Sequence, residues 1–75
     1  MDSRYEVVRG TGPDAAFVEL WDRSLAPDGL AFEVVADEHG SVTVTGYQVP
    51  APFEVVETFL EDARSYLAQE LGPSG

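Results

Sequence analysis

The chain contains no cysteine and no lysine, and its only histidine is His39. Without cysteine, disulfide bonds and thiolate zinc sites are excluded, so the folded state depends on packing or on association with another chain. His39 follows Asp37 and Glu38, but a tight turn points neighbouring side chains apart and offers only one nitrogen ligand. We therefore expect a solvated turn histidine and no metal site.

The sequence also lacks the motifs of nucleophilic and cofactor-dependent catalysis. It has no serine in a G-x-S-x-G elbow, and the glycines of residues 10–13 precede no lysine and do not form G-x-G-x-x-G. Carboxylates are numerous, but acid–base catalysis needs two of them in a pocket with separated pKa values, and most are expected on solvated faces. We predict a protein that is not an enzyme, with no catalytic, cofactor-binding or metal-binding residues.

Long apolar runs are absent, and the first residues have neither the basic stretch nor the apolar run of a secretory signal. We expect no membrane span and no leader. Together with the absence of cysteine, this favours a cytoplasmic location. Arginine without lysine is typical of a GC-rich genome and indicates a bacterium or a phage.

Negative charge dominates what the chain does contain, with 14 acidic residues against 4 basic ones and a formal net charge of −10. A field of this sign repels phosphates and anionic lipid, and it accelerates encounter with basic surfaces. The arginines are dispersed and form no basic stripe, which excludes direct binding of nucleic acid or membrane surfaces. The charge either serves a basic partner or only keeps a small protein soluble and monomeric.

The hydrophobic pattern predicts strands and helices in alternation along the first half of the chain. A short apolar run predicts a strand near residues 5–8. Pro13, followed by apolar residues at helical spacing, predicts a helix over residues 13–25. Alternation in twos then predicts a hairpin of two strands within residues 30–47, with a turn at residues 37–40.

The second half contains a stiff connector at residues 49–52, rich in proline, and a single apolar stripe that predicts a helix over residues 53–71. We expect the α+β class: a two-layer β-α-β-β-α sandwich, with a three-stranded, mostly antiparallel sheet in the order 1-3-2 and two helices on one face. Residues 1–72 form one small domain, and residues 73–75 form a disordered tail.

The last helix carries the candidate interaction residues. Glu54, Glu57 and Glu61 recur at i, i+3 and i+7 on its outer face, and Asp62 follows them. Like charges at this spacing destabilise an isolated helix, although the helix dipole offsets part of that cost near the amino terminus. The face is therefore either solvated or a docking surface. Tyr47, on the non-core face of the predicted hairpin, is the candidate aromatic anchor, whereas Trp21 and the phenylalanines fall on predicted buried stripes.

These features predict a small acidic, non-enzymatic protein-binding domain that caps a basic partner, as an inhibitor, a toxin-immunity protein or a mimic of nucleic-acid charge does. The alternative is a small homodimeric adaptor or chaperone that binds through a sheet edge or the exposed sheet face. In the expected topology, the strand that begins near residue 30 is a long apolar edge, which is free to pair with another chain.

Overall fold

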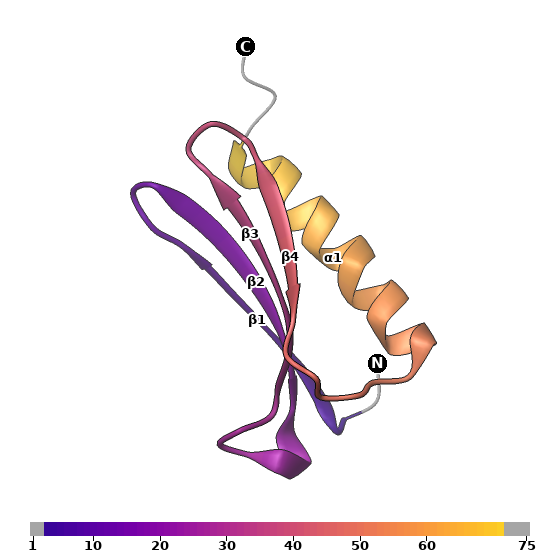
Figure 1. Cartoon of the computed structure of the whole chain (residues 1–75). Helices are drawn as coiled ribbons and strands as arrows, with labels where there is room; N and C mark the ends of the chain where they lie inside the picture. Colours follow the sequence, from indigo (N-terminus) through magenta and orange to yellow (C-terminus); the bar gives the residue numbers. More distant parts are fainter. Residues whose placement is uncertain (1–2, 72–75) are drawn as a thin grey trace.

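The computed structural model describes residues 3–71, which form a four-stranded antiparallel sheet and one long helix (Figure 1). The strands lie side by side in chain order, so each one pairs with the next. The α+β class is confirmed. The elements are β1 (Tyr5–Thr11), β2 (Ala15–Asp22), the short 3-10 helix η1 (Arg23–Leu25), β3 (Leu30–Asp37), β4 (Val42–Gly46) and α1 (Phe53–Leu71).

The predicted helix over residues 13–25 is wrong, because this segment forms β2. The segment carries apolar residues at both helical and strand spacing. Pairing with β1 on one side and β3 on the other selects the strand, which buries Ala16, Val18 and Leu20 on one face. The second helix and the strand order 1-3-2 are therefore also wrong, and a tight hairpin replaces the expected crossover.

The predicted β3–β4 hairpin is confirmed. Val34 lies opposite Val44 and Ala36 opposite Val42, so these side chains share one face of the sheet. In the turn, Gly40 adopts a positive φ of 83° and donates its N–H to the Asp37 carbonyl at 3.0 Å. However, β3 lies between β2 and β4 and is not an edge; the sheet edges are β1 and β4.

The last helix is confirmed over residues 53–71. It begins after the proline-containing connector, where the Pro52 carbonyl accepts the N–H groups of Val55 and Val56 at 3.0 and 3.1 Å. Its apolar stripe buries Phe59, Ala63 and Leu67 against the sheet.

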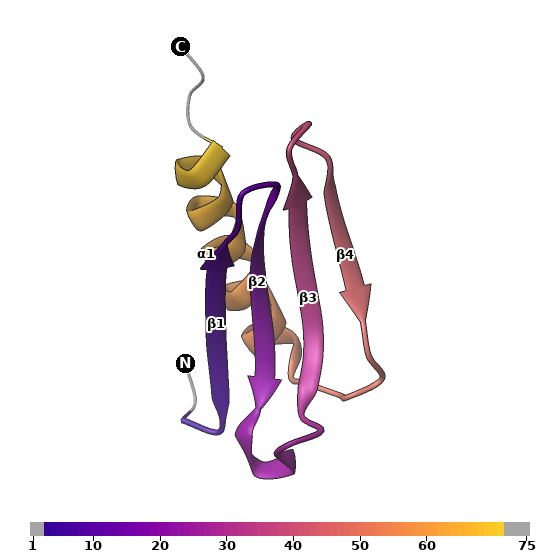
Figure 2. The same ribbon diagram turned by 90° about the vertical axis from the view of Figure 1, so that its left-hand side faces the viewer.

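The core lies between α1 and one face of the sheet. Its buried hydrophobic residues are Tyr5, Ala16, Val18, Leu20, Ala31, Val34, Ala36, Phe59, Ala63 and Leu67. The helix packs mainly against β1 and β2, so β4 stands clear of it, and no element of residues 3–71 covers the opposite face of the sheet (Figure 2). This arrangement leaves two surfaces open for binding. The predicted tail at residues 73–75 lies outside the described residues.

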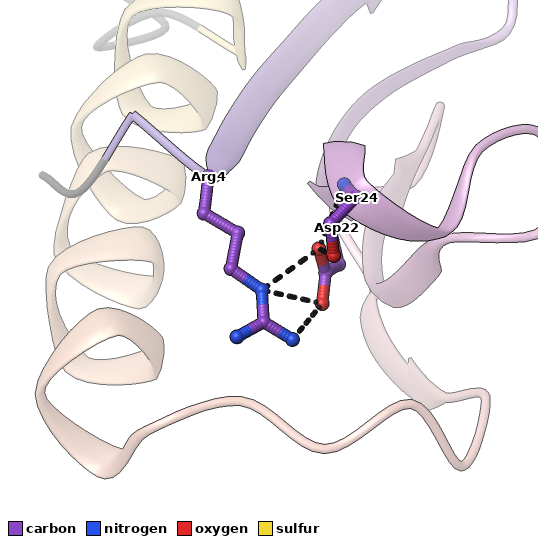
Figure 3. Close-up of polar contacts among 3 residues, drawn as sticks. All are labelled: Arg4, Asp22 and Ser24. Atoms are coloured by element: carbon purple, nitrogen blue, oxygen red, sulfur yellow. Dashed lines mark hydrogen bonds and ion pairs between the residues drawn. The ribbon is translucent and has the colours of Figure 1, made fainter.

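The end of β2 is anchored by a buried carboxylate, Asp22 (Figure 3). Arg4 donates from Nε to both carboxylate oxygens at 3.1 Å and from Nη2 to Oδ2 at 2.8 Å. Ser24 donates its hydroxyl at 2.6 Å and its N–H at 3.0 Å to Oδ1. These bonds, those from Arg4 first, lower the pKa of Asp22 from its usual 3.8 to about 2. Asp22 therefore joins the start of β1 to the turn after β2.

Candidate functional site

The structure does not bring the predicted interaction residues together. Glu54, Glu57 and Glu61 are exposed on α1, on the helix side of the sheet. Tyr47 follows β4 on the other side, because it continues the face that carries Thr45 and Glu33. The four residues therefore cannot form one continuous patch.

Asp62 is occupied by a contact within the protein. The Arg9 guanidinium donates to it from Nη2 at 2.7 and 2.6 Å and from Nε at 3.1 Å, and it also lies 5.8 Å from the centre of the Tyr66 ring. Tyr66 and Glu70 in turn share hydrogen bonds with the Thr11 hydroxyl at 2.6 and 2.7 Å. Asp62 therefore fastens α1 to β1 and is not a free docking group.

Tyr47 lies near two carboxylates, and these belong to Glu33 and Glu19 of the strands and not to the acidic residues of α1. Its hydroxyl donates to Glu33 Oε1 at 2.9 Å. This hydrogen bond, with some burial and the charges of Glu33 and Glu19, raises the pKa of the Tyr47 phenol. The tyrosine and both glutamates therefore share one environment on the open face of the sheet.

Glu19 and Glu33 lie directly opposite each other on β2 and β3. Glu19 accepts the Trp21 indole N–H at 2.9 Å, so each glutamate receives a hydrogen bond from an aromatic side chain. Within residues 3–71, neither glutamate forms an ion pair. Like charges opposite each other on neighbouring strands destabilise a sheet. Among the residues that the structure describes, this acidic pair is thus retained without a neutralising cation.

We call this surface the acid–aromatic face. Its residues are Glu6, Val8, Phe17, Glu19, Trp21, Glu33, Val35 and Tyr47. The predicted burial of Trp21 and Phe17 in the core is wrong, because both are half-buried on this face. A shallow hollow of about 330 Å³ lies beside Trp21, and it is lined by Glu6, Val8, Trp21, Asp22, Arg23 and Ala26. The Trp21 ring, the hollow beside it and the carboxylates of Glu6 and Glu19 therefore lie close together.

A second candidate surface lies on the helix side, between α1 and the uncovered strand β4. Val42 and Val44 lie opposite the buried Ala36 and Val34 on the helix side of the sheet, yet each is 55% exposed. The hollow measures about 370 Å³, and we call it the β4–α1 groove; it is lined by Val34, Val42, Val44, Leu60, Ala63, Arg64, Leu67 and Ala68.

The remaining chemistry of the structure is sparse. His39 is exposed and lies 3.4 Å from the Glu38 carboxylate. Over residues 3–71, no group of three or more histidine, aspartate or glutamate side chains is arranged to hold a metal ion. Within residues 3–71, no helix has both the length and the apolar composition needed to cross a membrane.

Sequence reasoning missed Glu19, Glu33 and Trp21 as members of one site. A signal for them was present, because Phe17, Glu19 and Trp21 alternate with the buried Val18 and Leu20. Assigning the segment to a helix distributed these residues around an axis instead of along one face. The error in secondary structure therefore concealed the site.

No protein-family model, no curated protein and no solved structure matches this chain.

Proposed function

We propose that this chain is a non-enzymatic protein-binding domain, and that it holds a basic partner on the acid–aromatic face. The observation that carries the proposal is the cross-strand pair of Glu19 and Glu33, which has hydrogen-bond donors but no cation among residues 3–71. A cationic side chain from a partner would neutralise the pair and remove the repulsion between them. Binding is thereby favoured over the free state.

The aromatic residues give this face its specificity. An arginine or lysine laid between the carboxylates lies near the rings of Trp21 and Tyr47, where cation–π attraction adds to the ionic contact. The net charge of −10 supplies the long-range attraction that brings a basic partner to the face. The mechanism therefore combines electrostatic steering with a small aromatic anchor.

This chemistry suits an inhibitor, an immunity protein for a toxin nuclease, or a mimic of nucleic-acid charge. Each of these covers a basic surface that would otherwise bind phosphates, and each requires a surface that phosphates avoid. We also propose a cytoplasmic location, because a chain without cysteine needs no oxidising compartment to fold.

The test uses Trp21, the only tryptophan, as an intrinsic fluorescent probe. A short peptide of arginine, glycine and serine is titrated into the protein, and we expect Trp21 fluorescence to change with a dissociation constant that rises steeply between about 0.05 and about 0.5 M salt. The double variant Glu19→Gln/Glu33→Gln should weaken binding by about tenfold or more.

The matched control is Glu57→Gln/Glu61→Gln, which removes the same charge from α1. It should weaken binding by less than about threefold, because these residues act on the acid–aromatic face only through the long-range field. Equal losses in the two double variants would mean that net charge alone attracts the peptide, and the proposed site would then be wrong.

The second candidate function, a homodimeric adaptor, is favoured by one observation about β4. All five residues of this edge strand are exposed and none is charged, whereas the other edge strand, β1, carries Glu6 and Arg9. Charged side chains protect an edge strand from pairing with another chain, and β4 lacks that protection. If the protein is a homodimer formed through β4, it should sediment as a dimer even at high salt. The substitution Val44→Lys should then convert it to a monomer.

A further inference from the structure

The β4–α1 groove is an apolar surface that the fold leaves uncovered, on the side of the sheet opposite the acid–aromatic face. Its lining is apolar except for Arg64, and the exposed side chains of Val42, Val44 and Leu60 contribute to it. Phe53 is 75% exposed and precedes Leu60 by seven residues, so it extends the same side of α1. Large apolar side chains therefore follow the length of the groove.

The strip of sheet left open beside α1 is β4, and Val34 of β3 forms the floor of the groove next to it. Neighbouring strands lie about 4.8 Å apart, and a helix with its side chains is about 10 Å across, so one helix covers about two strands. Here α1 packs mainly on β1 and β2, the helix-side residues Val34 and Ala36 of β3 are already buried, and β4 is the strand that a second helix would cover (Figure 2). Two-layer folds usually bury the full apolar face of such a sheet.

The charges on the rim of the groove indicate the character of that helix. Glu57 and Glu61 lie one turn apart on the outer side of α1, three residues or fewer from the groove-lining Leu60. Neither forms an ion pair within the described part of the chain. Basic residues beside the apolar stripe of the incoming helix would pair with them.

A second copy of this chain does not fit the groove. The one long helix of residues 3–71 already buries its apolar stripe of Phe59, Ala63 and Leu67 under its own sheet. Its outer face carries Glu54, Glu57 and Glu61, which would be brought against Val42 and Val44 with Arg64 as the one groove-lining cation for three carboxylates. The occupant is therefore a helix of another kind.

We propose that the β4–α1 groove binds an amphipathic helix of a partner protein, with the apolar stripe of that helix on Val44 and Leu60 and its basic flank beside Glu57 and Glu61. This site is separate from the acid–aromatic face, so a partner can engage both or either. The mode is the helix-in-groove recognition in which anchors recur at helical spacing.

The experiment measures binding of a leucine–lysine peptide whose leucines recur at helical spacing, using fluorescence anisotropy of the labelled peptide and NMR shifts of the protein. A peptide of the same composition with leucine at alternate positions serves as the strand-forming control. We expect the helical peptide to bind more tightly than the control by about tenfold or more, and to shift the signals of Val42, Val44 and Leu60.

Protein variants separate the groove from general charge attraction. Leu60→Gln, at an exposed position, should weaken binding about fivefold. Glu57→Gln/Glu61→Gln should weaken it about two- to tenfold, whereas Arg64→Gln should leave it equal or tighter. The charge-matched control Glu19→Gln/Glu33→Gln should leave the shifts at Val44 and Leu60 in place.

Three results would overturn the inference. The first is tighter binding of the strand-forming peptide, which would indicate addition to the β4 edge. The second is a groove that does not respond, seen either as shifts confined to the acid–aromatic face or as an affinity unchanged in Leu60→Gln. The third is concentration-dependent dimerisation that shifts the groove signals without peptide, because a second copy would then be the occupant.

Discussion

A single buried carboxylate, Asp22, joins three parts of the fold. It lies at the last position of β2, opposite Tyr5 of β1, and it caps η1 through the Ser24 N–H. A buried charge is tolerated only where partners replace its hydration, and here Arg4 and Ser24 do so. Removing either the Asp22 charge or the Arg4 guanidinium would therefore remove the hydrogen bonds between them at the junction of β1, β2 and η1.

The lowered pKa of Asp22 makes this junction sensitive to acid. Because its pKa falls from 3.8 to about 2 on folding, the charged form stabilises the fold above about pH 4, and that contribution is lost as the pH falls toward about 2. We expect Asp22→Asn to lower the free energy of unfolding at neutral pH and the difference from the parent to shrink below about pH 4. Urea unfolding at a series of pH values measures this.

The control for the acid-sensitivity measurement is Asp28→Asn, an exposed aspartate in the following loop. Its effect on the free energy of unfolding should be small. A difference between Asp22→Asn and the parent that stays constant from neutral pH to about pH 2 would contradict the assignment.

At the scale of elements, the sequence correctly predicts the segments whose hydrophobic periodicity fits only a helix or only a strand. Residues 53–71 carry a stripe of helical period after a proline connector, and residues 30–47 alternate with a glycine turn between them; both were predicted correctly. Residues 15–22 satisfy both periods, because Phe17, Leu20 and Trp21 suit a helix as well as a strand. Pairing with β1 and β3 selects the strand for this segment, and local propensity contains no information about such pairing.

For the candidate site too, the sequence predicts what depends on local pattern and misses what depends on long-range contacts. Tyr47 was predicted as exposed on the non-core face because its strand was assigned correctly, and it does lie there. The acidic residues of the last helix were also placed correctly as exposed, except Asp62. Its pairing with Arg9 depends on how α1 crosses β1, which is a long-range contact that spacing along the chain does not specify.

The connection between β2 and β3 depends on a glycine that only the folded structure identifies. A Cβ at Gly29 would overlap the backbone carbonyl of Asp22, whose own N–H donates to the Gly29 carbonyl at 2.7 Å. Backbone cannot rotate away as a side chain can, so we expect Gly29→Ala to destabilise the protein by about 1–3 kcal/mol. Chemical denaturation followed by circular dichroism measures the change.

Gly12→Ala, in the β1–β2 turn, is the matched variant. The nearest atom to its Cβ would be the Ala15 carbonyl oxygen at 3.6 Å, an ordinary contact. We expect a change within about 0.5 kcal/mol in either direction. Similar losses in both variants would mean that glycine acts through backbone flexibility at both turns and not through the close approach at Asp22.

For the whole molecule, charge has two opposed effects. A net charge of −10 on a chain of 75 residues repels itself in the folded state, and the same field attracts a basic partner. Within residues 3–71, Arg4 and Arg9 are committed to Asp22 and Asp62, so most of the acidic side chains have no cation beside them. The basic partner that we propose would therefore reduce this repulsion on binding.

The location of each acid, and not the total charge, should then determine its effect on stability. Glu19→Gln keeps an acceptor for the Trp21 indole N–H and removes the repulsion from Glu33, so it should stabilise the free protein by about 0.2–1 kcal/mol. Glu54→Gln changes the net charge equally, but it removes a favourable charge from the first turn of α1 and should destabilise by about 0.3–1 kcal/mol.

Thermal unfolding of both variants at low and high salt distinguishes local from global electrostatics. If both substitutions stabilise the protein by the same amount, self-repulsion of the whole molecule is the main effect, and the Glu19–Glu33 pair has no special role. Opposite signs that converge at high salt would instead locate the repulsion in that pair. If Glu19→Gln stabilises the protein and also weakens its binding of the basic peptide, the Glu19 carboxylate is retained for binding at the expense of stability.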